Sequence, residues 1–441
     1  MTCLRVIRSA ALPRPGQEPS LTATSLRAAG VDPRLTLASL CLLYFLVSAG
    51  AFSSLGVVLP AMVAELKWSW TQAGLGYTLL GVACGLASFL PAILIRRIGV
   101  SGALAAGAVL LVTGFGLLAL AREIWQYLAG TVLIGTAFAL TTTVPGSHVL
   151  TGLFKRQSTV LGIYFTCGGL GGVAGPLFYV VIHTVTDGWR AYWWVLMAAS
   201  AVVGLFAILT TPGRRPDEPS MTAPPEQGGP AEVLADLREW TVRRALMTPR
   251  FYVIVGAYTM YLLINTTSHG FAVAHLTERG VDAKAAAGML SLEALIGAGV
   301  SIIGGLVGEK IASKTLMIVA LAAMIAGLEG LTLARGMGPD SLLLMSVYAV
   351  GVGIGVGLSF IASTLLLLQH FGRRPNLELY AIMCLLSTTA ALGPALGGWM
   401  RDRLGDFVLT FQLCALATLA VLVATCFLRR PSPEPAQDIR S

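Results

Sequence analysis

Charge is scarce in this chain of 441 residues, because Asp, Glu, Lys and Arg together make up only 12% of it, against 55% hydrophobic residues. A water-soluble protein of this size with so few charged side chains would expose large apolar patches. The composition therefore excludes an ordinary soluble protein and indicates a chain whose solvent is lipid.

Several sequence motifs that carry enzyme chemistry are also missing. The chain has no Gly-x-x-x-x-Gly-Lys-Ser/Thr for nucleotides, no His-Glu-x-x-His for zinc and no Gly-x-Ser-x-Gly for a nucleophile. The seven cysteines stand singly, mostly in apolar segments, without the spacing of a metal site. We therefore expect that the protein is not an enzyme and holds no cofactor and no metal.

Long apolar segments fill most of the chain instead, and each is close to the roughly 20 residues that a helix needs to cross a bilayer. They lie at 36–64, 73–95, 101–121, 124–148, 158–183, 190–211, 251–276, 284–308, 314–334, 340–368, 378–400 and 407–428. Hydrocarbon offers no hydrogen-bond partner to the backbone, so such segments must be helical. The sequence predicts an all-α membrane protein with twelve transmembrane helices.

The basic residues predict the orientation of these helices, because short loops rich in Lys and Arg stay in the cytoplasm. If both termini are cytoplasmic, all but eight of the 30 Lys and Arg residues lie inside. The eight outside are Lys67, Arg122, Arg190, Arg279, Lys284, Arg335, Arg401 and Arg403. We expect a multi-pass, monomeric protein of the cytoplasmic (inner) membrane. We expect no nucleic-acid binding, because the basic residues sit at helix ends and form no single face.

The longest break in hydrophobicity, at 212–249, divides the chain into two halves of six helices each. We expect a cytoplasmic tail at 1–34, a first half at 35–211, a cytoplasmic linker at 212–249, a second half at 250–428 and a second tail at 429–441.

The two halves also repeat one another in sequence. A shift of about 214 residues places Ser54 and Gly56 on Ser268 and Gly270, and a shift of about 218 places Gly175-Pro176 on Gly393-Pro394. Parallel repeats of this kind enclose a site near the middle of the membrane between two halves that rock against one another. This arrangement predicts a secondary transporter that works by alternating access. Without an ATPase motif, a gradient must drive it.

Two loops carry a family resemblance. The segments FLPAILIRRIG (Phe89–Gly99) and GGLVGEKIASK (Gly304–Lys314) occupy equivalent places in the two halves. They resemble the Gly-x-x-x-Asp-Arg-x-Gly loop of the major facilitator superfamily, which latches helix ends across the halves. The resemblance implies a gating role for Glu309 and Lys310 in the second loop, and for Arg96 and Arg97 in the first, where Arg96 stands in the place of the acid.

Three further segments, Gly152–Pro176, Ser48–Met62 and His370–Arg374, resemble the monocarboxylate porter and oxalate:formate antiporter branch of that superfamily. This resemblance implies symport or antiport of a small monocarboxylate-like metabolite. Within it, Gly175-Pro176 and Gly393-Pro394 are expected to bend their helices during gating, because proline removes a helical hydrogen bond.

One acidic residue lies well inside a predicted span. Glu293 is near the centre of the eighth segment, where an ionised side chain costs about 2.5 to 3.5 kcal/mol on insertion scales. We interpret Glu293 as a proton-coupling site or as the counter-ion of a cationic substrate. The alternative is a neutral glutamic acid that is hydrogen-bonded to a neighbouring helix.

A polar run in the seventh segment, Asn265 to His269, is expected to face the same central cavity. The imidazole of His269 can relay protons or donate to a carboxylate, although a histidine bonded between helices is equally compatible with the sequence. The set expected to contact solute or protons is Glu293, His269, Asn265, Thr267, Ser53, Ser54, Tyr44, Thr142 and His148. His183, His275 and Lys284 are expected at the membrane interface.

No predicted span carries a Lys or Arg away from its ends, so a carboxylate substrate would lack a basic partner there. Efflux of neutral or cationic drug-like compounds is therefore an alternative to monocarboxylate transport. A membrane sensor that binds a solute without moving it is a second alternative.

Overall fold

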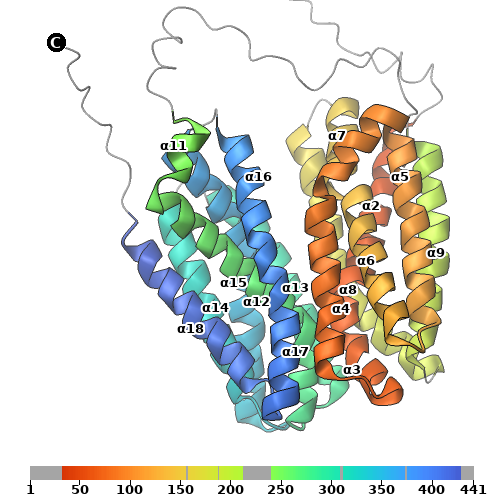
Figure 1. The fold of residues 1–441 in the computed structure, drawn as a ribbon, viewed down its shortest axis with the longest axis vertical. Coiled ribbons are helices and arrows are strands. Elements are labelled where there is room, and N and C mark those ends of the chain that lie inside the picture. Colours follow the sequence, from red (N-terminus) through yellow and green to blue (C-terminus); the bar gives the residue numbers. More distant parts are fainter. Residues whose placement is uncertain are drawn as a thin grey trace, which may run out of the picture.

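The computed structural model describes residues 32–154, 157–186, 188–211, 240–307, 311–372 and 375–428. Every regular element in this part of the chain is a helix, which confirms the predicted all-α class. The helices form two bundles that lie side by side, one from each half of the sequence (Figure 1).

The elements of the first bundle are α2 (Pro33–Ser48), the π-helical η1 (Ala49–Ser53), α3 (Ser54–Leu66), α4 (Trp70–Leu86), the 3₁₀ turn η2 (Ala87–Phe89), α5 (Leu90–Ala119), α6 (Ile124–Thr141), α7 (Thr143–Leu153), α8 (Gln157–Thr186) and α9 (Trp189–Thr210). Those of the second are α11 (Val242–Leu246), α12 (Pro249–Glu278), α13 (Ala283–Val307), α14 (Ser313–Leu333), α15 (Pro339–Phe371), α16 (Asn376–Ser387), the 3₁₀ turn η3 (Thr388–Ala391), α17 (Leu392–Leu404) and α18 (Val408–Cys426). The short helix α11 lies within the segment expected to be a linker.

Twelve helices of membrane-spanning length follow from these elements. Ten helical segments of the described chain are long and apolar enough to cross a bilayer. One of them, Trp70–Ala119, contains two crossings, because Gly99 adopts φ 78° and ψ 173° and turns the chain sharply. The polar run of α12 lowers its mean hydropathy, yet its 30 residues also span the bundle. With α12, the number of membrane crossings in the described chain is twelve.

Three crossings are interrupted next to a proline, whose ring clashes with the carbonyl four residues earlier. Thr142, with φ −109° and ψ −113°, separates α6 from α7 three residues before Pro145. The turns η2 and η3 tighten the chain just before Pro91 and Pro394. Pro176, by contrast, lies inside an unbroken α8.

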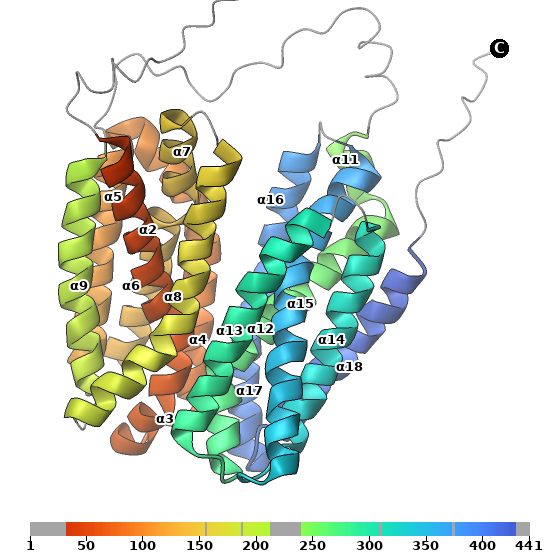
Figure 2. The same ribbon diagram turned by 180° about the vertical axis from the view of Figure 1, so that it is seen from behind.

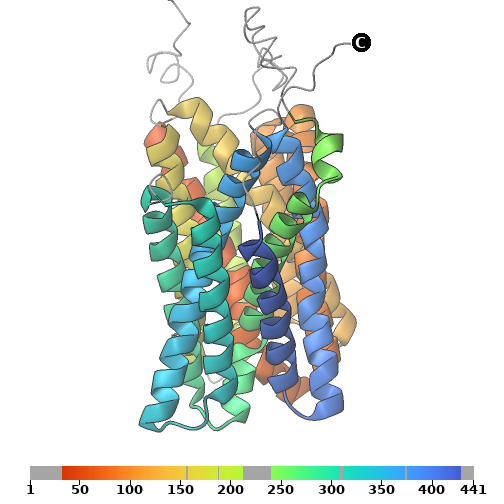
Figure 3. The ribbon, with the colours of Figure 1, turned by 90° about the vertical axis from the view of Figure 1, so that its left-hand side faces the viewer.

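The first and last described residues lie at one face of the molecule, which we call the terminal face, where α2 and α12 begin and α9 and α18 end (Figures 1 and 3). We call the opposite face the loop face. It carries the connections 67–69, 120–123, 279–282, 334–338 and 405–407.

The two bundles approach one another toward the loop face and lie farther apart at the terminal face (Figure 2). Most of the contacts between them come from α4 packing on α17, α8 on α13 and α3 on α12. Glycine makes these crossings close, since a Cβ at Gly74 would overlap the Pro394 carbonyl and a Cβ at Gly398 would overlap the Trp70 carbonyl. Small residues at helix crossings are what packing in lipid favours.

Candidate functional site

Glu293, near the middle of α13, is 1% exposed and is hydrogen-bonded to two neighbouring helices. The Tyr348 hydroxyl on α15 donates to its Oε2 at 2.6 Å, and the Ser268 hydroxyl on α12 lies 3.4 Å from the same oxygen. The two hydroxyl oxygens are 2.8 Å apart. Hydrogen bonds to an ionised acceptor are about twice as strong as neutral ones, so this arrangement can stabilise a carboxylate away from water.

His269 lies beside this carboxyl group. Its Nδ1 is 2.9 Å from the Asn265 carbonyl oxygen and 4.0 Å from Oε1 of Glu293. Because a carbonyl only accepts, the contact with Asn265 favours the form with a proton on Nδ1. An ion pair with Glu293 forms only when the imidazole carries a second proton. We call Glu293, Tyr348, Ser268 and His269 the carboxylate cluster.

The carboxylate cluster adjoins the crossing of the two bundles. Gly56 of α3 lies against the backbone of α12 at His269, so closely that a Cβ at Gly56 would overlap the His269 carbonyl. Tyr77 of α4 packs against Gly270, and its hydroxyl donates to the Phe52 carbonyl at 2.6 Å. A change in the cluster can therefore act directly on contacts between the two halves.

The first-span serines do not join this cluster. The Ser54 hydroxyl donates to the Ala49 carbonyl at 2.6 Å and lies 2.5 Å from the Tyr192 hydroxyl, both within the first bundle. Ser53 is 4% exposed and faces Gly172 of α8. Ser53 ends the π-helical turn η1 and Ser54 follows it, and no motif in the sequence signals that turn.

Tyr44 and Thr142 belong to a second group of side chains, which we call the aromatic cluster. The Tyr44 ring lies 4.8 Å from that of Tyr164 and also contacts Phe138 and Phe165. The Tyr164 hydroxyl donates to the Thr142 carbonyl at 3.0 Å, across the break between α6 and α7. Tyr44 is partly exposed, so it offers an aromatic surface within the bundle.

The other expected contact residues are Thr267, His148 and Asn265, whose backbone carbonyl contacts His269. Asn265 is partly exposed, and Thr267 is buried against Gly393 with no hydrogen-bond partner for its hydroxyl among the described residues. His148 is partly buried on α7.

His275, which the sequence places at the interface, is instead 1% exposed. The packing of α12 against the rings of Phe407 and Phe411 buries it.

The expected gating residues fall into three groups. Gly175 packs closely on Ala49, and Gly393 on Leu263 and Thr267, so both glycines mark close helix contacts. Arg96 and Arg97 are exposed at the terminal face, at the end of the second crossing. Glu309 and Lys310 lie outside the described residues.

Sequence reasoning missed several contacts that join the two bundles at the loop face. Asp402 of α17 accepts hydrogen bonds from the backbone N–H groups of Trp70, at 3.0 Å, and Thr71, at 2.7 Å, and so caps α4 of the other bundle. Asp402 stands in a charged pattern, Arg-Asp-Arg, that predicts only an exposed helix end.

Sequence reasoning also missed Tyr348 of the carboxylate cluster, because one tyrosine in an apolar span carries no signal of its own.

Among the described residues, no group of three or more His, Cys, Asp or Glu side chains is arranged to hold a metal ion. The side chains of the carboxylate cluster can exchange protons, form hydrogen bonds and pair charges.

Comparison with known proteins agrees with this architecture. A family model described as Major Facilitator Superfamily matches residues 40–383. A search of curated proteins found no match to the sequence. A crystal structure of the nucleoside transporter NupG, a D323A mutant, is similar with a TM-score of 0.69 at 15% identity, over 90% of this chain and 99% of that one. A POT family transporter in complex with 5-aminolevulinic acid is similar with a TM-score of 0.68 at 15% identity, over 88% and 96% of the two chains.

Proposed function

The chain belongs to the major facilitator superfamily, and we propose that it moves a small organic solute across the membrane in exchange for, or together with, protons. The solute is a small molecule, and the proposal places proton binding at Glu293. The observation that carries it is the buried carboxyl group of Glu293, held by Tyr348 and Ser268 beside His269.

In this proposal the cluster alternates between two protonation states of Glu293. When Glu293 is ionised, the Tyr348 hydroxyl supplies a charge-assisted hydrogen bond and a protonated His269 supplies the counter-charge. When Glu293 is protonated, the pair with His269 has no charge to hold it, and α12 and α13 are freer to separate. Because α12 also forms the crossing with α3 at Gly56, protonation biases the contact between the halves.

We propose a monocarboxylate-like metabolite as the solute, in line with the resemblance of Gly152–Pro176 and its companions to that branch. No Lys or Arg of the described chain pairs with the carboxylate cluster. The anion is therefore expected to enter with a proton and to bind between His269 and the aromatic cluster around Tyr44.

Efflux of a neutral or cationic compound is the second candidate. The observation that favours it is the same carboxyl group, which lies among aromatic and hydroxyl side chains and would attract a cation.

A thermal-shift screen separates the two candidates. The purified protein is heated in detergent at pH about 5.5 and 7.5 with lactate, oxalate, uridine and ethidium as probes; binding at 100 times Kd stabilises by about 2.7 kcal/mol. Stabilisation by lactate or oxalate that is stronger at the lower pH supports the monocarboxylate proposal. Stabilisation by ethidium alone overturns it in favour of efflux.

A further inference from the structure

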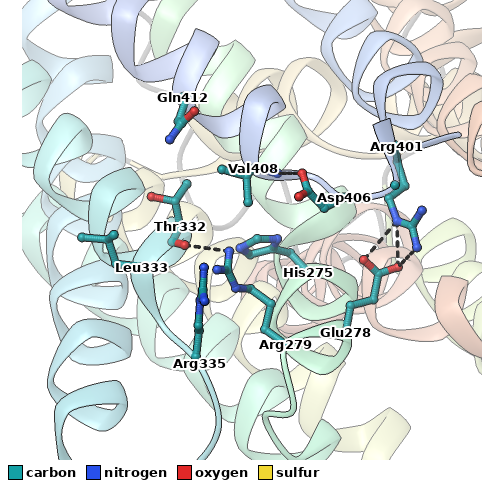
Figure 4. A pocket seen from close by; sticks show the side chains of 11 residues that line it. His275, Glu278, Arg279, Thr332, Leu333, Arg335, Arg401, Asp406, Val408 and Gln412 are labelled. Atoms are coloured by element: carbon teal, nitrogen blue, oxygen red, sulfur yellow. Dashed lines mark hydrogen bonds and ion pairs between the residues drawn. The ribbon is translucent and has the colours of Figure 1, made fainter. Parts of the chain in front are cut away.

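A cavity of about 740 Å³ opens at the loop face of the second bundle, at the far end of α12 from the terminal face (Figure 4). Side chains from α12, α14, α17 and α18 line it, together with the connections that follow α12 and α14. Neither the carboxylate cluster nor the aromatic cluster contributes to its wall. The proposed transport mechanism does not involve this cavity.

His275 is a buried polar group in the wall of this cavity. Its ring is 1% exposed, and neither ring nitrogen makes a hydrogen bond of good geometry within the described part of the chain, although the Leu331 backbone carbonyl lies nearby. Figure 4 shows the ring beside the guanidinium group of Arg279. Buried polar atoms in proteins nearly always have partners, so this ring calls for a ligand that can accept a hydrogen bond.

Positive charge dominates the cavity. Arg401 is neutralised by Glu278, with 3.0 Å between Nη2 and Oε1. Arg279 and Arg335, by contrast, form no ion pair with any described acidic residue. The guanidinium of Arg279 donates to the Thr332 carbonyl at 2.8 Å. Burial and the nearby charge of Arg335 lower the pKa of Arg279, and the charge of Asp406 offsets this lowering only in part.

One carboxylate, Asp406, also lines the cavity and reduces this surplus. Its Oδ1 accepts a hydrogen bond from the Val408 backbone N–H at 2.9 Å, which fixes it at the start of α18. With Glu278 paired to Arg401, the two remaining guanidinium groups still outnumber the single remaining carboxylate. The cavity is therefore suited to an anion.

We propose that this cavity binds a phosphate or phosphate-ester group. The guanidinium groups of Arg279 and Arg335 hold it, and the His275 ring donates a third hydrogen bond. Guanidinium forks match the oxygen geometry of phosphate. The group can belong to a soluble phosphate ester or to the headgroup of an anionic phospholipid. A headgroup can reach the cavity because its lining includes the exposed Leu333 and Gln412 on the outer sides of α14 and α18.

The test compares Arg335→Gln with Arg403→Gln. Arg335 makes no hydrogen bond or ion pair within the described chain, so its substitution should leave the fold intact. Arg403 is an exposed residue of α17 that does not line the cavity, and its substitution removes the same charge from the same face. In the first arm, the purified protein in neutral detergent is titrated with inorganic phosphate at constant ionic strength while its melting temperature is followed.

In the second arm, the protein is melted in nanodiscs of phosphatidylcholine with and without phosphatidylglycerol, in phosphate-free buffer. Saturable stabilisation by inorganic phosphate, weakened about tenfold or more in Arg335→Gln but not in Arg403→Gln, supports the proposal with a soluble ligand. Stabilisation by phosphatidylglycerol alone, with the same dependence on the two variants, supports it with a lipid headgroup. No stabilisation in either arm, or an equal loss in both variants, overturns it.

A third variant sharpens the result. Asp406→Asn keeps an oxygen that can accept from Val408 N–H but removes the negative charge, so it should tighten binding of the anion in whichever arm is positive. Unchanged or weaker binding in this variant would contradict a site in which charge selects the ligand.

Discussion

At the scale of single residues, the central observation is that the carboxyl group of Glu293 meets hydroxyl groups from two other helices. Tyr348 lies 55 positions away along the chain and Ser268 lies 25 positions away, yet both hydroxyls contact the same oxygen. The contact with Tyr348 is the shorter of the two, so Tyr348 should be the main donor to an ionised Glu293. A residue that stabilises only one protonation state should affect proton release more than solute binding.

Tyr348→Phe should therefore slow net proton-driven uptake about tenfold, because a hydrogen bond to a charged group contributes about 1.5 to 3 kcal/mol. Exchange of labelled for unlabelled solute, which needs no proton release, should change little. Both rates are measured in proteoliposomes. Tyr252→Phe, at an exposed position of α12, is the matched control. An equal loss of both rates would show that Tyr348 has only a structural role.

The sequence singled out Glu293 as a candidate because a charge inside an apolar span has a high cost wherever it points. The sequence could not predict the positions of Ser53 and Ser54. A hydroxyl group has a low free-energy cost in a membrane helix, because it can donate a hydrogen bond to the backbone of its own helix. The bond from Ser54 to the Ala49 carbonyl follows from the π-helical turn, a local backbone feature without a sequence motif.

At the scale of helices, the two bundles are held together by crossings at which helix backbones approach closely. Gly56, Gly74 and Gly398 each bring one backbone against another across the boundary between the bundles. The sequence does not show which helix faces meet, because packing depends on partners from distant parts of the chain. The proline breaks at Pro145 and Pro394 were more predictable, since the steric cause is local.

Gly56→Ala tests the crossing of α3 and α12. The added methyl group would overlap the His269 carbonyl, so the variant should separate the bundles at the loop face. Hydrogen–deuterium exchange of the peptides covering 54–66 and 265–278 should become faster. Gly288→Ala is the control, because nothing lies within 4 Å of a Cβ built there. Exchange that matches the unmodified protein would contradict a crossing that depends on glycine.

Asp402→Ala tests the cap that α17 provides for α4. Loss of the carboxylate leaves the N–H groups of Trp70 and Thr71 without their acceptor and should weaken the closed loop face by about 1 to 2 kcal/mol. Spin labels on α4 and α17, followed by pulsed electron resonance, should report a larger share of long distances. Asp340→Ala, at an exposed helix start within the second bundle, should leave that distribution unchanged.

At the scale of the whole molecule, the internal repeat explains why the site lies at the crossing of the halves. Gly56 and Gly270, which the shift of about 214 residues superimposes, meet across the boundary between the bundles, where a Cβ on Gly56 would lie 3.3 Å from Cα of Gly270. Equivalent positions of two parallel repeats can meet only near the axis that relates them. The repeat was visible in the sequence, whereas the proximity of Glu293 to that axis depends on the packing of α13 against α12.

The orientation of the molecule is a prediction from its basic residues, which are concentrated in the segments expected to be cytoplasmic. A green fluorescent protein fused after Ser441 should fluoresce in a bacterial host, and an alkaline phosphatase fused at the same place should be inactive. The reverse pattern would place the termini on the outer side and contradict the orientation predicted from the basic residues.

The central claim is that protons drive transport through Glu293. The most direct measurement compares the unmodified protein with Glu293→Gln in proteoliposomes, with an imposed pH gradient and radiolabelled lactate, or the best ligand of the thermal-shift screen. Glu329→Gln, on an exposed position of α14, is the control. We predict that Glu293→Gln abolishes accumulation driven by the gradient but retains exchange of labelled for unlabelled solute. Accumulation that persists at the unmodified rate would contradict the account.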